Sequence, residues 1–291
     1  MNFWPILVLA SSGLQVARNA AQRELTALLG LWGATYVRFL YGLPFAIIWT
    51  VGIALWRGAS GGPNIAFVLW VLLGAATQAA ATAGVVLAMR GRAFAVATAF
   101  TKTEAAGTAL VGVALIHDVL TPGDWIGIAL GTIGIISMAR VSINSEALNA
   151  AFAGIGAGVL FSFSSVAYRA AAQNWGGDGW VGAAATLSAT LTVQTIGGGA
   201  LMGLFQRPSL KLMISAWKPC LVPGACGAFA SALLFTGFSI GPSAGAVKAV
   251  QLVDVPVAWA VSRRLFRERI GLHEAIGIAL ILAGALAVVL S

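Results

Sequence analysis

The five residues Ile126–Leu130, IGIAL, recur unchanged as Ile276–Leu280, at an offset of 150 residues. The same offset aligns Gly134 with Gly284 without a gap. Self-similarity at one fixed offset indicates an internal duplication. The sequence therefore predicts two copies of one structural unit, and this duplication decides the fold.

Acidic residues are among the aligned positions. The aligned acidic pairs are Glu104 with Asp254, Asp118 with Glu268, and Asp124 with Glu274. The alignment places a first repeat at residues 1–140 and a second at 150–291, joined by a loop at 141–149.

The composition indicates a membrane protein. Of the 291 residues, 59% are hydrophobic and 9% are charged, whereas soluble domains have roughly 45–50% apolar and about 25% charged residues. Too few charges are present to cover a water-facing surface, which argues against a soluble enzyme, a nucleic-acid-binding protein and a disordered chain. The net charge of +8 comes from 17 Lys and Arg that form no dense basic run.

Apolar stretches between charged or Gly/Pro-rich breaks are long enough to cross a bilayer as helices. The ten candidates are residues 4–20, 30–56, 65–89, 93–116, 123–140, 150–172, 179–205, 213–239, 243–264 and 271–290. We therefore expect an all-α membrane protein with ten transmembrane helices. Five helices per repeat is an odd number, so the second repeat would enter the membrane upside down, as a 5+5 inverted repeat. Secondary transporters recurrently use this plan, with a site at the midplane.

The fourth and fifth spans of each repeat share a succession of motifs. In the second half these are Leu252–Pro256 (LVDVP), the turn Phe266–Arg269, Gly277 and Gly284; in the first half they are Thr103–Ala105, His117–Asp118, Gly127 and Gly134. Duplicated halves with these features resemble the drug/metabolite transporter superfamily, and its EamA-type members in particular. The resemblance implies a ten-helix fold and the export or exchange of metabolites such as amino acids, sugars and nucleotide derivatives.

The chain departs from that family pattern at a few positions. Ala105 stands where the family has proline in span 4, and in span 9 the proline is shifted by one, to Pro256. His117 and Arg267 replace the glycine that precedes the acid of the turn. These departures concern local detail, while the implied architecture is unchanged.

Charged residues inside the spans are costly, by at least ~2.5–3.5 kcal/mol each at the bilayer centre. They are Arg18, Arg38, Lys102, Glu104, Arg169, Lys248 and Asp254. Arg18 and Arg169 lie near span ends, where a long side chain can reach the interface. Arg38 has aromatic neighbours and is open to two interpretations, an interfacial anchor or a pathway residue.

Four of these charges lie deep in spans 4 and 9. Two acids that faced one cavity would repel each other, so lysines are their natural partners. We hypothesise the cross-pairs Lys248–Glu104 and Lys102–Asp254. A role in the transport pathway and a purely structural role both remain open for them.

Polar side chains in the spans provide the candidate site. We expect substrate binding or the pathway to involve Gln15, Arg38, Gln78, Thr98, Thr101, Lys102, Tyr168, Gln194, Lys248 and Gln251. Glu104 and Asp254 are the candidates for proton coupling or ion pairing. The excess of positive over negative groups favours a solute with a carboxylate or phosphate.

The expected function is secondary transport of a small metabolite, an amino acid or another small solute, by alternating access with proton coupling or exchange. Export across the inner membrane is the direction we expect. The alternatives are a channel or facilitator of low selectivity and a membrane-embedded protein without transport activity. An enzyme is not expected, because the sequence offers no nucleophile–base pair, metal cluster or phosphate-binding loop, and we expect no cofactor and no metal.

The loop charges predict the orientation. Basic residues concentrate in the loops after spans 1, 3, 5, 7 and 9, while Arg57 is the basic residue assigned to the opposite face. The positive-inside rule then places both termini outside a multi-pass inner-membrane protein. The expected partners are a small solute and the lipid bilayer, without nucleic acid; one chain suffices for a pathway, and a dimer stays open.

Overall fold

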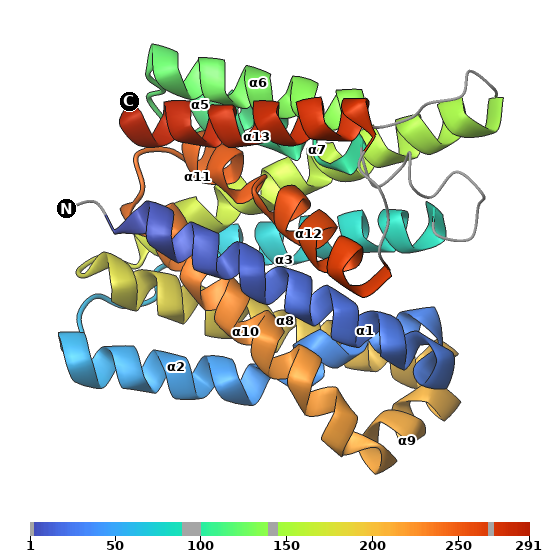
Figure 1. The fold of residues 1–291 in the computed structure, drawn as a ribbon. Coiled ribbons are helices and arrows are strands. Elements are labelled where there is room, and N and C mark those ends of the chain that lie inside the picture. Colours follow the sequence, from blue (N-terminus) through green and yellow to red (C-terminus); the bar gives the residue numbers. More distant parts are fainter. Residues whose placement is uncertain (1–2, 89–99, 139–144, 267–270) are drawn as a thin grey trace. The chain divides into compact units, whose positions relative to one another are not determined.

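The computed structural model describes residues 3–88, 100–138, 145–266 and 271–291, which are helical with short connections (Figure 1). Among these residues, six helices are long and apolar enough to cross a membrane, and two shorter apolar helices are Glu104–Ile116 and Pro122–Met138. Large apolar side chains such as Leu55, Ile65 and Leu290 are exposed. An all-helical protein with exposed apolar faces and spanning-length helices is suited to a membrane, as the composition predicted.

The contacts divide the chain into two compact units. Unit 1 comprises residues 1–9, 77–166 and 241–291, and unit 2 comprises residues 10–76 and 167–240. Each unit therefore combines segments from both halves of the sequence, so the units cut across the two sequence repeats.

Unit 2 contains most of the N-terminal helices together with the helices between residues 167 and 240. Its helices are α1 (Trp4–Leu40) from residue 10 onward, α2 (Gly42–Arg57), α3 (Ile65–Ala88) to residue 76, the end of α7 (Ser145–Asn174), α8 (Gly179–Phe205), α9 (Arg207–Ser215) and α10 (Trp217–Ile240). Small clusters of buried side chains hold these helices together. In one of them Phe67 and Val71 of α3 pack against Ala171 and Ala185.

The helix α1 consists of two arms joined at Gly30, whose φ of 69° is accessible mainly to glycine. Across this joint, the Gln22 side-chain amide donates to the Ala34 carbonyl at 2.9 Å. A straight helix would separate residues 22 and 34 by about 18 Å along its axis, so the chain folds back at Gly30. The sequence predicted separate spans at 4–20 and 30–56, and the reversal lies at the start of the second.

Unit 1 contains the remaining helices. They are the first turns of α1, the end of α3, α5 (Glu104–Ile116), α6 (Pro122–Met138), most of α7, α11 (Ala244–Gln251), α12 (Asp254–Phe266) and α13 (Leu272–Leu290). Ala105, Ile135, Leu252 and Ile281 form a buried cluster at its centre.

Helices α6 and α13 approach each other closely through glycine. A Cβ on Gly134 would lie 2.7 Å from the Gly277 carbonyl oxygen, and a Cβ on Gly284 would lie 2.6 Å from the Gly127 carbonyl oxygen. These four glycines are the residues that the 150-residue offset relates. Gly134 thus packs against Gly277, which is the counterpart of Gly127. Gly127 packs against Gly284, which is the counterpart of Gly134. A local two-fold relation between α6 and α13 requires this exchange.

Candidate functional site

The two helices that carry the deep charges are interrupted at equivalent places. A turn at residues 102–103 precedes α5, and a turn at 252–253 separates α11 from α12. In the turns, the amide of Thr103 donates to the Phe100 carbonyl and the amide of Val253 donates to the Val250 carbonyl, both at 3.2 Å. Glu104 and Asp254 are therefore each the first residue of a new helix, where a negative charge is favoured by the helix dipole.

This break corrects one expectation. The stretch 243–264, predicted as a single helix, is two helices, because the backbone bonds of residues 250–255 tighten from four-residue to three-residue spacing. Pro256, which has no N–H to donate, lies in the first turn of α12, where that loss costs little. In the predicted span 93–116, residues 93–99 lie outside the described residues.

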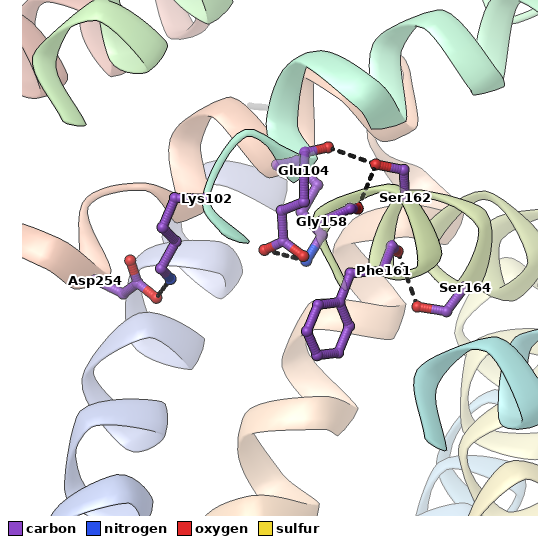
Figure 2. Close-up of polar contacts among 8 residues, drawn as sticks. Lys102, Glu104, Gly158, Phe161, Ser162, Ser164 and Asp254 are labelled. Carbon is purple, nitrogen blue, oxygen red and sulfur yellow. Dashed lines mark hydrogen bonds and ion pairs between the residues drawn. The ribbon is translucent and has the colours of Figure 1, made fainter. Parts of the chain in front are cut away.

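Both hypothesised ion pairs are present in unit 1. The Lys102 ammonium lies 2.5 Å from Asp254 Oδ2, and the Lys248 ammonium lies 3.3 Å from Glu104 Oε1. Figure 2 shows the first pair and the Glu104 carboxylate beside it. Each lysine binds the acid of the opposite half of the sequence. The acids are related by the 150-residue offset, whereas the lysines are not.

The two pairs differ in exposure. The side chains of Lys248 and Glu104 are 9% and 13% exposed, whereas Lys102 is 25% exposed and its partner Asp254 is 10% exposed. The second oxygen of Asp254, Oδ1, is buried and accepts no hydrogen bond from the residues that the structure describes. The Lys248–Glu104 pair is thus largely enclosed. In the Lys102–Asp254 pair the lysine is more exposed, and the carboxylate can accept a further hydrogen bond.

Helix α7 supports the turn before α5. The Ser162 hydroxyl lies 3.1 Å from the Glu104 carbonyl and 2.9 Å from the Gly158 carbonyl (Figure 2). Gly158 lies directly against the turn, since a Cβ there would be 3.0 Å from the Thr101 carbonyl oxygen. The position of Glu104 is therefore fixed by α7 as well as by its own helix.

The N-terminus of α11 is held by two side chains. Ser243 accepts a hydrogen bond from the Ala246 amide at 3.0 Å, as an N-cap residue does. Asp118, which follows α5, accepts from the Ala244 amide at 2.7 Å. The chain after α5 thereby fixes the short helix that carries Lys248. Sequence reasoning missed this role of Asp118, because nothing local relates residues 118 and 244.

In unit 2, Tyr168 and Gln194 come together. The Tyr168 hydroxyl donates to the Gly74 carbonyl at 2.9 Å and is also in hydrogen-bond range of the Gln194 side chain. The guanidinium carbon of Arg38 lies 4.5 Å from the centroid of the Phe39 ring, in a cation–π contact. Gln15 is half-buried on α1 in the same unit.

The structure corrects the expectation for Arg169. Its position near a span end suggested a side chain reaching toward the interface, but the side chain is buried and donates to the Phe238 carbonyl. This interpretation was wrong because α10, which the sequence could not place, supplies an acceptor inside unit 2.

The other predicted site residues lie in unit 1. Thr101 and Gln251 are buried close in sequence to the two turns, and Gln78 is half-buried on α3. Thr98 lies outside the described residues. Over the described part of the chain, no group of three or more His, Cys, Asp or Glu could hold a metal ion.

Comparison with known proteins addresses the fold. No family model matches the chain, and no curated protein matches it. A solved structure described as "Crystal structure of protein" is similar to 99% of this chain and 96% of its own, with a TM-score of 0.72 and 19% sequence identity. At this identity the likeness shows a shared fold alone.

Proposed function

We propose that the protein is a secondary transporter of the EamA type, with ten spans in two inverted five-helix repeats, that exports a small metabolite by alternating access. The observation that carries the proposal is the presence of two ion pairs, one of them largely buried, at equivalent helix breaks in unit 1. Interrupted helices with charged residues at membrane depth are tolerated where they are enclosed by protein or line a cavity, and transporters build their sites there.

The inverted repeat is supported by three relations at the 150-residue offset. The turns occur at equivalent positions, the acids that follow them are equivalent, and the glycines of α6 and α13 pack reciprocally. Such relations are expected where one ancestral five-helix unit is used twice in opposite orientation.

The ion pairs supply a means of coupling. Each carboxylate is neutralised by a lysine and would be neutralised equally by a proton, so a proton can replace the lysine without leaving a buried charge on the acid. The released lysine is then available to an anionic solute. A cycle in which acids alternate between lysine and proton would couple movement of the solute to movement of protons, or support exchange when no proton gradient is present.

The test has two stages. Metabolites exported by cells with and without overexpression identify the solute, and purified protein in proteoliposomes is then assayed for saturable flux and counterflow of that solute. We expect Glu104→Gln and Asp254→Asn to lose acceleration by a pH gradient, while Asp178→Asn, which alters an acid outside the proposed pathway, retains it. Flux that does not saturate and shows no counterflow would instead identify a channel, and no difference in exported metabolites would contradict transport of a metabolite.

The proposed orientation places both termini outside the inner membrane. It is supported by the concentration of basic residues in alternate loops. A C-terminal reporter that is active only in the cytoplasm is expected to be silent, and activity of that reporter would contradict the orientation.

A further inference from the structure

Helix α9 is a short helix between two long ones. Gln206 separates it from α8 and Ala216 separates it from α10, and neither of these residues has helical dihedral angles. Figure 1 shows that α9 makes a sharp angle with α10. A helix that turns away from the direction of a spanning helix is placed to lie along the membrane surface.

One face of α9 is held against α1. The Met213 side chain is buried, and the Tyr41 hydroxyl donates to the Met213 carbonyl at 2.9 Å. A Cβ on Gly33 would lie 3.3 Å from Ser209 Cβ, so the second arm of α1 approaches the same face. Ser209 and Met213 are four residues apart and therefore share this face. The orientation of α9 is thus fixed by contacts within unit 2.

The opposite face of α9 is basic. Arg207 and Lys211, also four residues apart, are exposed, and Lys218 is exposed at the start of α10. The Arg207 Nε–H donates to the Gly203 carbonyl at 2.7 Å, which fixes this guanidinium at the end of α8. The ammonium of Lys218 lies 5.8 Å from the centroid of the Trp217 ring.

The sequence around α9 keeps this face positive. Between Asp178 and Asp254 the chain contains no Asp or Glu. The acid of the neighbouring α1 reversal, Glu24, directly follows Arg23, and both are exposed. The charges of that pair offset each other, so the basic residues of α9 and Lys218 set the sign of the surface.

Apolar side chains accompany the basic face. Leu204 and Phe205, the last residues of α8, are largely exposed, and so is Ile214 of α9. A soluble acidic partner would leave these side chains in a polar environment, whereas acyl chains would cover them. The change from apolar to basic residues between Phe205 and Arg207 is typical of the boundary between acyl chains and headgroups.

The length of α8 agrees with this depth. Its 27 residues span about 40 Å, close to the roughly 40–45 Å of a bilayer with its headgroups. At the beginning of α8, Trp180 packs edge-to-face on Trp56, with ring centroids 5.8 Å apart. Tryptophan is enriched at membrane interfaces. The two ends of α8 therefore match the two interfaces, and α9 follows the end that lacks this tryptophan pair.

We propose that Arg207, Lys211 and Lys218 bind the headgroups of anionic phospholipids. Guanidinium and ammonium groups form charge-assisted hydrogen bonds with phosphate oxygens, and juxtamembrane basic residues are attracted to anionic lipids. Phosphatidylglycerol has a net negative charge and phosphatidylcholine has none, so the surface distinguishes them. The inference does not rest on the proposed transport function, because it concerns the lipid-facing side of the protein.

Hydrogen exchange of the purified full-length protein in nanodiscs tests the surface. The nanodiscs contain phosphatidylcholine, with or without phosphatidylglycerol, and exchange is read from peptides that cover α9 and the start of α10. We expect phosphatidylglycerol to slow this exchange at least threefold, because bound headgroups hold α9 in place. Salt at about 1 M is expected to remove the difference by screening.

The loop 58–64 is the internal reference. It follows Arg57, which is paired with Asp178, and it lies at the end of α2 rather than beside α9. An anionic bilayer lowers the pH at its surface and thereby slows exchange everywhere along it. The change in the loop measures this general effect, and the threefold slowing in α9 is expected beyond it.

The decisive variant combines Lys211→Gln with Lys218→Gln. Arg207 is left in place, because its bond to Gly203 also holds the end of α8. Both lysines are exposed, so the variant is expected to fold with an unchanged unfolding midpoint and to lose the response of α9 to phosphatidylglycerol. Two matched controls are expected to keep the response: the pair Lys211→Arg and Lys218→Arg, which preserves the charge, and Arg57→Gln.

Three results would overturn the proposal. The first is equal exchange of α9 in both kinds of nanodisc after correction by the reference loop. The second is a response to phosphatidylglycerol that persists in the folded double glutamine variant. The third is equal slowing by inorganic phosphate or by polyglutamate in phosphatidylcholine nanodiscs, which would assign the surface to a soluble anion or to an acidic protein.

Discussion

Lys248 of α11 contacts Glu104 of α5 although 144 residues separate them in the chain. Because both side chains are largely buried, removing one leaves the other charge without its partner. Such truncations cost about 3–5 kcal/mol, whereas replacing both partners is often nearly neutral. We therefore expect Lys248→Ala and Glu104→Ala to destabilise the protein strongly as single variants and the double variant to recover much of the loss.

Thermal unfolding of the four members of this cycle in one detergent measures the coupling. Lys218→Ala, which removes an exposed lysine, is the control and is expected to leave the midpoint nearly unchanged. Additive losses in the double variant would show that the contact contributes nothing specific.

The second ion pair provides an internal comparison. Since Lys102 is 25% exposed and Lys248 is 9% exposed, we infer that water in the proposed pathway reaches Lys102 and screens the Lys102–Asp254 pair more effectively. Lys102→Ala is expected to lower the unfolding midpoint less than Lys248→Ala does. Equal or reversed losses would mean that exposure does not set the strength of these pairs.

The glycine contact between α6 and α13 predicts a steric effect. A Cβ on Gly134 would collide with the backbone of Gly277, and overpacking of this kind costs about 1–3 kcal/mol. Gly156→Ala is the matched control, because no atom of the described part of the chain lies within 4 Å of its Cβ position and alanine is favoured over glycine in a helix by roughly 0.5–1 kcal/mol. We expect opposite shifts of the unfolding midpoint, and shifts of the same sign would contradict the close packing.

Asp118 is expected to stabilise the beginning of α11. A carboxylate at a helix N-terminus contributes about 0.3–1 kcal/mol, and up to ~2 kcal/mol when partly buried. Asp118→Asn should therefore speed hydrogen exchange of the α11 amides and lower the midpoint slightly, while Glu24→Gln, at an exposed acid, should do neither. Unchanged exchange in α11 would contradict the capping role.

The pair between Arg57, the last residue of α2, and Asp178, which directly precedes α8, lies at helix ends and predicts a pH dependence. Partial burial raises the pKa of Asp178, but hydrogen bonds from Arg57 and from the Trp180 amide outweigh it and hold the pKa below the ordinary 3.8. The resulting stabilisation is present above pH 3.8 and is lost as the pH falls through the lower folded-state pKa. It is small, because both side chains are partly exposed.

The difference in unfolding midpoint between the wild type and Asp178→Asn isolates this effect, since asparagine can still cap the helix. We expect a constant difference above pH 4 that shrinks at lower pH. A difference that grows on acidification would have the wrong sign.

The sequence could predict features that follow from charge and repetition. The two ion pairs followed from the cost of burying Lys102, Glu104, Lys248 and Asp254 separately, and the equivalence of the acids followed from the 150-residue offset. The helical class followed from composition. The ten-span count and the transport role stay predictions.

Features that depend on tertiary contacts could not be predicted. Ala105 gave no signal of the helix break that precedes it, because the turn there forms without a proline and is held by Ser162 and Gly158 of another helix. The burial of Arg169 and the capping by Asp118 likewise depend on partners far along the chain. Gly30 was a readable signal, since an isolated glycine is where a helix can reverse.

Each of the two ion pairs joins one residue from the first half of the sequence to one from the second half, and this has a consequence for biogenesis. Glu104 and Lys102 leave the ribosome well before their partners Asp254 and Lys248, and the distance from Glu104 to Lys248 is 144 residues. At about 5–20 residues per second this delay amounts to roughly 7–29 s. During that interval the charges of the nascent first half lack their partners, and because an unpaired charge at the bilayer centre is costly, we expect residues 100–116 to reach their final position only after translation of the second half.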